Sequence, residues 1–158
     1  GDIPDIDQPL DTGTEVKLHV PALIPDDYLP DISTRLVLYK RIAQAQSAEN
    51  LRDIQVEMID RFGLLPEPVK NLFTCALLKV SAQQLGISEI DMTDEGGSIE
   101  FNATTSVEPA AIVSLIQSAP HCYSLTNTGK LRVKKSLPAL SDRAEFVEKL
   151  MTPWLEAA

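Results

Sequence analysis

Aromatic residues are scarce in this chain: Phe, Trp and Tyr together make up 5% of the 158 residues, and there is a single Trp. Apolar residues of all kinds nevertheless reach 44%, which is enough to build a buried core. That core must be made mainly of Leu, Ile, Val and Ala. No apolar run approaches the ~20 residues of a membrane-spanning helix, so no membrane partner is expected.

Histidine and cysteine are also rare, with two residues of each. The sequence has no CxxC, HExxH or EF-hand loop, and we therefore predict no metal and no cofactor. His121 and Cys122 are adjacent, but neighbours on an extended chain point to opposite faces and cannot act as a nucleophile and its base. We predict no catalytic residue and no enzymatic activity. Two scattered cysteines fit a reducing cytoplasm.

Positive charge is in the minority, with 14 Lys and Arg against 23 Asp and Glu and a formal net charge of −9. A surface of that sign repels phosphate backbones, so direct contact with nucleic acid is not expected. The same charge suits a basic protein surface. The chain begins with Gly rather than Met, and we expect it to be a piece of a longer protein.

The first 15 residues are rich in acidic side chains and contain Pro4, Pro9 and Gly13. Such a composition buries little apolar surface and predicts a linker or a pinned acidic tail over residues 1–15. Residues 16–158 are expected to form a single domain. It opens at residues 16–20, where apolar and polar residues alternate as in a half-buried strand.

Three helices are predicted next. Asp31 and Ser47 are expected to cap the first and second, and the second ends at Phe62 with Gly63 in the C-terminal capping position. The third runs from Pro66 to Leu85. On the first helix the predicted apolar stripe is Ile32, Leu36, Tyr39 and Ala43, with Ile42 alongside. Across the three helices the predicted core is Leu36, Leu51, Ile54, Met58, Phe62, Leu72, Phe73, Leu77 and Val80.

After Gly86 the apolar period changes from helical to alternating. The segments 87–92 and 98–102 flank a Gly-containing turn, and so do 123–126 and 130–134, which predicts two β-hairpins. A short helix is expected between them, and a last helix capped by Ser141 follows. The predicted fold class is α+β, with helices packed on a small, mainly antiparallel sheet.

The second predicted helix carries a row of acidic residues: Glu49, Asp53, Glu57 and Asp60. At 100° per residue they fall within an arc of about 80°, opposite the apolar stripe. Like charges four residues apart destabilise a helix by ~0.2–0.5 kcal/mol per pair. Two interpretations remain open at this point: an ordinary solvated face, or a docking surface for a basic protein partner.

A basic row is also present, because Lys130, Arg132 and Lys134 share one face of the last predicted strand. This secondary candidate patch could hold a phosphate or an acidic peptide. The alternative is a solvated edge strand on which basic side chains discourage unwanted strand pairing.

The run from Arg35 to Phe73, RLVLYKRIAQAQSAENLRDIQVEMIDRFGLLPEPVKNLF, resembles the C-terminal domain of the bacterial transcription-repair coupling factors, the Mfd family. The pattern shared with this family covers about residues 16–155. Its motifs are specific in combination and occupy Pro25–Asp31, Arg35–Arg41, Asp60–Pro66, Val69–Leu72 and Leu85–Ile87.

The resemblance implies a C-terminal regulatory domain of a larger bacterial protein in the cytoplasm. Members of this family are ATP-hydrolysing DNA translocases that displace stalled RNA polymerase and recruit UvrA to nucleotide excision repair. This chain lacks a Walker A loop. In the family this domain docks on the N-terminal UvrA-binding module of the same polypeptide and masks it. The resemblance therefore favours autoinhibition by a monomeric chain and a partner for the acidic row. We predict that this row is the docking surface, with Glu57 and Asp60 at its centre and Asp53 beside them. The alternative is an adaptor that binds RNA polymerase or another repair protein in trans.

Overall fold

The structure is a computed structural model that describes residues 13–158, so most of the tail predicted over residues 1–15 lies outside the described residues. The chain divides into two compact units. The helical unit is His19–Val80; the sheet unit is Ser81–Ala158 together with the described residues up to Leu18. The prediction of a single domain over residues 16–158 stays a prediction.

The helical unit contains α2 (Ile32–Ala43), α3 (Ala48–Phe62) and most of α4 (Glu67–Leu85). Both predicted N-caps are confirmed. The Asp31 carboxylate accepts a hydrogen bond from the Thr34 N–H, and the Ser47 hydroxyl accepts one from the Asn50 N–H. These bonds satisfy amide groups that have no partner inside a helix and so fix where the helices begin.

The core of the helical unit contains most of the predicted residues. Leu51, Ile54, Met58, Phe73 and Val80 are buried in it, and Phe62 and Leu72 pack against it. Two predictions are wrong: Leu36 is 63% exposed and Leu77 is 40% exposed. On α2 the buried residues are instead Leu38 and Ile42. These two lie about 120° or more away from Leu36 around the helix, so the stripe that packs inward is rotated from the expected one.

The sheet unit has five strands in the order β1-β2-β3-β5-β4. They are β1 (Glu15–Lys17), β2 (Ile87–Thr93), β3 (Gly96–Phe101), β4 (Tyr123–Leu125) and β5 (Leu131–Lys134). Both hairpins are confirmed, as β2–β3 and β4–β5. Only β1 pairs in parallel, with β2. The α+β fold class with a mainly antiparallel sheet is therefore confirmed.

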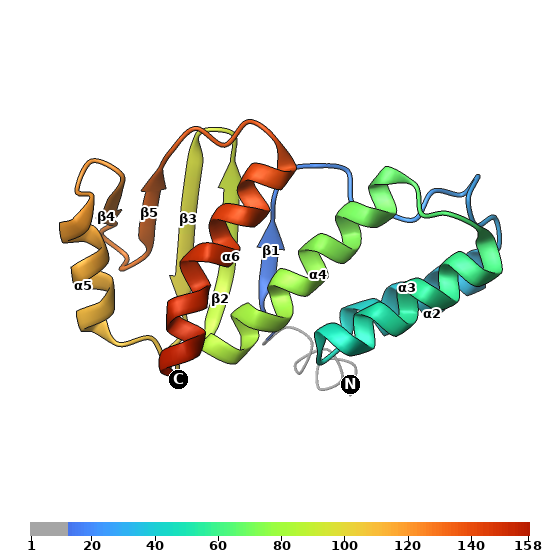
Figure 1. The fold of residues 1–158 in the computed structure, drawn as a ribbon, viewed down its shortest axis with the longest axis horizontal. Helices are drawn as coiled ribbons and strands as arrows, with labels where there is room; N and C mark the ends of the chain where they lie inside the picture. Colours follow the sequence, from blue (N-terminus) through green and yellow to red (C-terminus); the bar gives the residue numbers. More distant parts are fainter. Residues whose placement is uncertain (1–12) are drawn as a thin grey trace, which may run out of the picture. The chain divides into compact units, whose positions relative to one another are not determined.

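Helices cover one face of this sheet. In Figure 1, α6 (Leu140–Ala157, red) lies across the strands, and α5 (Pro109–Ser118) lies beside β4. Leu131 and Val133 of β5 are buried, whereas Arg132 and Lys134 between and after them are exposed. Because side chains alternate along a strand, these two basic residues lie on the face opposite the helices.

The start of α6 differs from the prediction that Ser141 caps it. Ala139 occupies the N-cap position, and the Asp142 carboxylate reaches back to accept a hydrogen bond from the Ala139 N–H at 3.0 Å. The next residue, Arg143, is buried at 7% exposure. Its guanidinium donates to the backbone carbonyls of Leu137 and Pro138 and to that of Leu18 at the end of β1. It thereby ties the first strand to the last helix.

Trp154 and the two cysteines can each be assigned to one of the units. The single tryptophan, Trp154, belongs to the sheet unit, where it is 8% exposed and meets the Phe101 ring edge-on at 5.8 Å. The free thiols are divided, since Cys75 lies on α4 in the helical unit and Cys122 lies in the sheet unit. Burial raises the pKa of the Cys75 thiol.

Candidate protein-binding surface

The acidic residues of α3 lie on the side away from the core. Leu51, Ile54 and Met58 form the buried side of the helix, and Glu49, Asp53 and Asp60 are exposed on the other. Glu57 is half-buried. The helical spacing expected from the sequence is therefore present, and the structure brings the four carboxylates onto one face.

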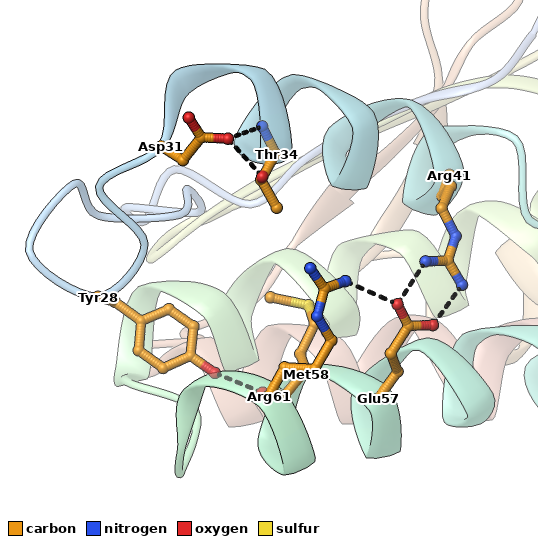
Figure 2. A network of polar contacts seen from close by, with 7 residues as sticks. All are labelled: Tyr28, Asp31, Thr34, Arg41, Glu57, Met58 and Arg61. Atoms are coloured by element: carbon orange, nitrogen blue, oxygen red, sulfur yellow. Dashed lines mark hydrogen bonds and ion pairs between the residues drawn. The ribbon is translucent and has the colours of Figure 1, made fainter.

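Glu57 differs from the other three because it is already paired (Figure 2). Each of its oxygens accepts a hydrogen bond at 2.9 Å from the Arg41 guanidinium of α2, which gives a bidentate pair. Arg61, one turn further along α3, donates to the same carboxylate at 3.0 Å. The pair joins α2 to α3 on the solvent side of their contact.

The two guanidinium groups stabilise the charged form of Glu57. The pKa of this carboxyl is lowered, first by the hydrogen bonds from Arg41 and then by the one from Arg61. The side chain keeps 36% of its exposure, so solvent screens the pair, and a contribution of only ~0.2–1 kcal/mol is expected. Bidentate geometry places it towards the upper part of that range. Glu57 therefore supports the fold as well as carrying charge.

The remaining three carboxylates have no ion pair or side-chain hydrogen bond among residues 13–158, and they lie beside an exposed apolar side chain. Val56 is 61% exposed. At 100° per residue it lies about 20° outside the acidic arc, next to Glu49, and within about 60° of Asp53 and Asp60. Apolar and charged side chains side by side on an exposed surface are a combination found in protein-binding patches. We call this set, Glu49, Asp53, Val56, Glu57 and Asp60, the acidic face.

The segment after α3 turns at Gly63, the residue predicted in the C-terminal capping position. Gly63 has φ 99° and ψ −175°, a conformation that is essentially restricted to glycine. The Tyr28 hydroxyl donates to the Gly63 carbonyl at 2.8 Å, and the Tyr28 ring meets Phe62 edge-on at 6.1 Å. Leu64, the residue after Gly63, is 85% exposed. The hydrogen bond from Tyr28 to the Gly63 carbonyl therefore forms at this turn without any packing of Leu64.

Exposed apolar side chains concentrate in the helical unit. Of ten exposed large hydrophobic residues, eight belong to it. They are Leu23, Ile32, Leu36, Val37, Val56, Ile59, Leu64 and Leu77. Within residues 13–158, the sheet unit contributes Val113 and Leu125. Exposed aliphatic residues scattered singly are common, whereas contiguous apolar patches are typical of interaction surfaces.

The secondary candidate patch is found on β5 and the residue before it. Arg132 and Lys134 are exposed, and the Lys130 ammonium lies 3.9 Å from the Glu100 carboxylate of β3. This patch belongs to the sheet unit, whereas the acidic face belongs to the helical unit.

Groups suited to other chemistry do not gather elsewhere in the described part of the chain. Among residues 13–158, no three His, Cys, Asp or Glu side chains are placed to hold a metal ion. Every buried side-chain nitrogen or oxygen in this range has a hydrogen-bond partner. None of the helices described is long and apolar enough to cross a membrane.

Sequence reasoning missed Arg41 and Val56. Arg41 lies in the last turn of α2, 16 residues before Glu57. A short connection between two helices places them antiparallel, which is the signal that could have paired these residues. Val56 stands out in the sequence as an apolar residue at the edge of the acidic arc, about 20° from Glu49.

Comparison with known proteins identifies the family. The family model of the TRCF domain matches residues 18–112, more than half of the chain. The chain is 44% identical over 138 residues to the transcription-repair-coupling factor of Escherichia coli (strain K12), which covers 87% of this chain and 12% of that protein. With the Haemophilus influenzae protein of the same name it shares 40% over 148 residues, 94% of this chain and 13% of the relative. The chain belongs to the TRCF domain family.

The fold agrees with a solved relative. A crystal structure of the C-terminal domain of a transcription-repair coupling factor superposes with a TM-score of 0.72 at 22% identity, covering 85% of this chain and 88% of the other. The chain spans only about an eighth of the length of the curated relatives that it matches. It therefore corresponds to one part of those larger proteins.

Proposed function

We propose that this chain is the non-catalytic C-terminal regulatory domain of a transcription-repair coupling factor and acts as an intramolecular clamp. In this proposal the acidic face of α3 docks on the N-terminal module of the same polypeptide and masks its binding site for UvrA. The parent is an ATP-hydrolysing DNA translocase of the bacterial cytoplasm that engages stalled RNA polymerase. The observation that supports the clamp is a helix face on which three carboxylates, unpaired among residues 13–158, lie beside an exposed Val56.

The four acidic residues have two different roles in this proposal. Glu49, Asp53 and Asp60 are free to meet arginines of the partner, because they have no partner among residues 13–158. Glu57 is held by Arg41 and Arg61. Its role is to lock α3 against α2 and to keep two guanidinium groups at the edge of the face. A partner arginine can still approach its carboxylate from the solvent side, since each carboxylate offers about four acceptor sites.

A latch of this kind needs little energy. One exposed ion pair contributes only ~0.2–1 kcal/mol. Tethering within one polypeptide supplies an effective concentration of the order of mM, and several pairs act together. Moving a latch from 99% closed to half open requires about 2.7 kcal/mol, half of the full switch from one state to the other. Losing three contacts near the upper end of that range would therefore open about half of the population.

The test uses the full-length coupling factor and its binding to UvrA. Replacing Asp53 and Asp60 with Asn removes two unpaired carboxylates and leaves the Arg41–Glu57 pair in place. We expect this variant to bind UvrA much more strongly than the wild type, which stays masked. Asp26→Asn with Asp27→Asn is the matched control, because both residues are exposed, lie in the helical unit and change the charge equally.

A second variant tests the division of roles. Glu57→Ala with Asp60→Ala should also unmask UvrA binding, and it should lower the stability of the helical unit because Arg41 and Arg61 lose their partner. If both double variants stay as masked as the wild type, the acidic face is not the latch. The adaptor alternative makes a different prediction: the chain would bind RNA polymerase or a repair protein in trans and would ignore the parent's N-terminal module in a pull-down.

A further inference from the structure

The outer face of the sheet holds two cations without partners. Arg132 and Lys134 are exposed on β5. Neither makes an ion pair or a side-chain hydrogen bond with any of residues 13–158. The lack of acidic partners for Arg132 and Lys134 does not result from a shortage of acidic residues, because the chain carries 23 of them.

The strands on either side of β5 leave these cations unpaired. In the register of the sheet, Arg132 stands between Ser98 of β3 and Ser124 of β4, and Lys134 stands opposite Gly96. Hydroxyls and a glycine neither neutralise a charge nor obstruct the approach of a ligand. The neighbours of Arg132 and Lys134 in the sheet are therefore small and uncharged.

Two other lysines, in or next to strands of the same sheet, have acidic partners. Lys17 of β1 pairs with Glu89 of β2 at 2.8 Å, and Lys130 lies 3.9 Å from Glu100 of β3. Opposite charges across neighbouring strands stabilise a sheet, and the sequence uses that device at these two positions. Opposite Arg132 and Lys134, the neighbouring strands carry Ser98, Ser124 and Gly96, and none of these is charged.

The surrounding sequence strengthens the local charge. Residues 109–141 contain no Asp or Glu, and their basic residues are Lys130, Arg132, Lys134 and Lys135. No acidic loop from this segment can fold back to neutralise the strand. The positive field on this part of the sheet is therefore available to a partner.

We propose that this face of β5 binds an extended, acidic protein segment whose carboxylates occupy alternate positions. Residues two apart on a strand are separated by about 6.6 Å, which is the spacing of side chains on the same side of a second extended chain. One carboxylate would pair with the Arg132 guanidinium in the bidentate geometry that arginine favours, and the next would meet Lys134. This surface is separate from the acidic face and does not depend on the proposed clamp.

Charge on the rest of the face favours a protein segment over nucleic acid. Glu100 lies on β3, beside β5, and Asp91 is in register with Ser98, two strands from Arg132. At ~4.8 Å between strands these carboxylates fall within about 10 Å of the cations, close to the Debye length of about 8 Å in physiological salt, so their repulsion of a polyanion is only partly screened. A long polyanion would meet them, whereas a short segment aligned with β5 would not.

The experiment is an NMR titration of the 158-residue chain with a peptide in which Glu alternates with Thr, up to a few mM. We expect shifts centred on β5 and binding that weakens with salt. Arg132→Gln with Lys134→Gln should raise the dissociation constant about fivefold, which corresponds to ~1 kcal/mol. Lys40→Gln with Lys70→Gln is the control for charge, since both lysines are exposed in the helical unit, and it should change the dissociation constant less than twofold.

Three outcomes would overturn the proposal. The first is an absence of shifts on β5 at the highest peptide concentration. The second is an affinity that responds equally to the β5 variant and to the lysine control, which would indicate a general charge effect. The third is tighter binding of oligo(dT) than of the peptide with the same dependence on Arg132 and Lys134, which would make the face a nucleic-acid surface. A matched peptide with Gln in place of Glu should not bind.

Discussion

Replacing Arg143 with Met is expected to destabilise the sheet unit strongly. The guanidinium is buried, and it donates to the carbonyls of Leu18 at 2.8 Å, Leu137 at 2.9 Å and Pro138 at 3.2 Å. Leu18 is 125 residues away in the sequence. Methionine keeps much of the aliphatic stem but has no donor. Three carbonyls then lose their partner in a place that the side chain had closed to water.

The magnitude follows from the cost of an unsatisfied buried acceptor, about 1–3 kcal/mol each. Three such groups would give ~3–9 kcal/mol. The variant also no longer buries a charge, and some water will enter, both of which reduce the loss. We expect a net loss of ~2–5 kcal/mol. With a urea m-value of ~2 kcal/mol/M, the unfolding midpoint should fall by about 1–2.5 M.

The assay is urea unfolding followed by the fluorescence of Trp154, which lies on the same helix as Arg143 and is buried against Phe101. Arg132→Met is the matched control, because it makes the same substitution on an exposed strand position, and it should change stability by less than ~0.5 kcal/mol. Arg143→Lys should fall between the two, since an ammonium cannot span three carbonyls. A loss below ~1 kcal/mol for Arg143→Met would refute the reasoning and would mean that water replaces the guanidinium without cost.

Three further predictions concern the helical unit. Ile54→Ala should cost ~2–5 kcal/mol in urea unfolding, because Ile54 is 1% exposed, whereas Leu36→Ala should cost less than ~1 kcal/mol; similar values would contradict the orientation of α2. Gly63→Ala should cost ~1–3 kcal/mol although no atom lies within 4 Å of the added Cβ, because the backbone conformation itself is strained for alanine; a neutral result would mean that the turn rearranges. The pKa of Glu57 is lowered in the folded state, so its pair with Arg41 stabilises the fold above the ordinary glutamate pKa of about 4.3 and is lost as the pH falls through the folded value. The stability difference between wild type and Glu57→Gln should therefore be constant from about pH 6 to 8 and shrink below about pH 4; a difference that grows on acidification would exclude the pairing.

Features that depend on neighbouring residues could be predicted from the sequence. The caps Asp31 and Ser47, the positive φ of Gly63 and both hairpins are set by local hydrogen bonds and by the conformations that glycine permits. The stripe of α3 was also predictable, because its apolar residues occupy one side and charged residues the other. Interactions between residues that are close in the sequence determine these elements almost completely.

The rotation of α2 could not be predicted in the same way. Its apolar residues extend around most of the helix, so Leu36 and Leu38 compete for the core, and only packing against α3 and α4 decides between them. The same is true of Leu77 and Leu78 on α4. For the candidate site, the acidic arc was evident in the sequence, but the capture of Glu57 by Arg41 is a tertiary contact between two helices.

Because each unit contains one cysteine, the rates of thiol modification can report on the two units separately. Cys75 and Cys122 are both partly exposed, so a thiol reagent can reach each of them in the folded chain. The raised pKa of the Cys75 thiol keeps it protonated and slow to react at neutral pH. The rate of its modification therefore reports on the surroundings of α4 in the helical unit. Cys122 provides an independent record for the sheet unit within the same sample. A partner that docks on α3 should slow the modification of Cys75 and leave the modification of Cys122 unchanged.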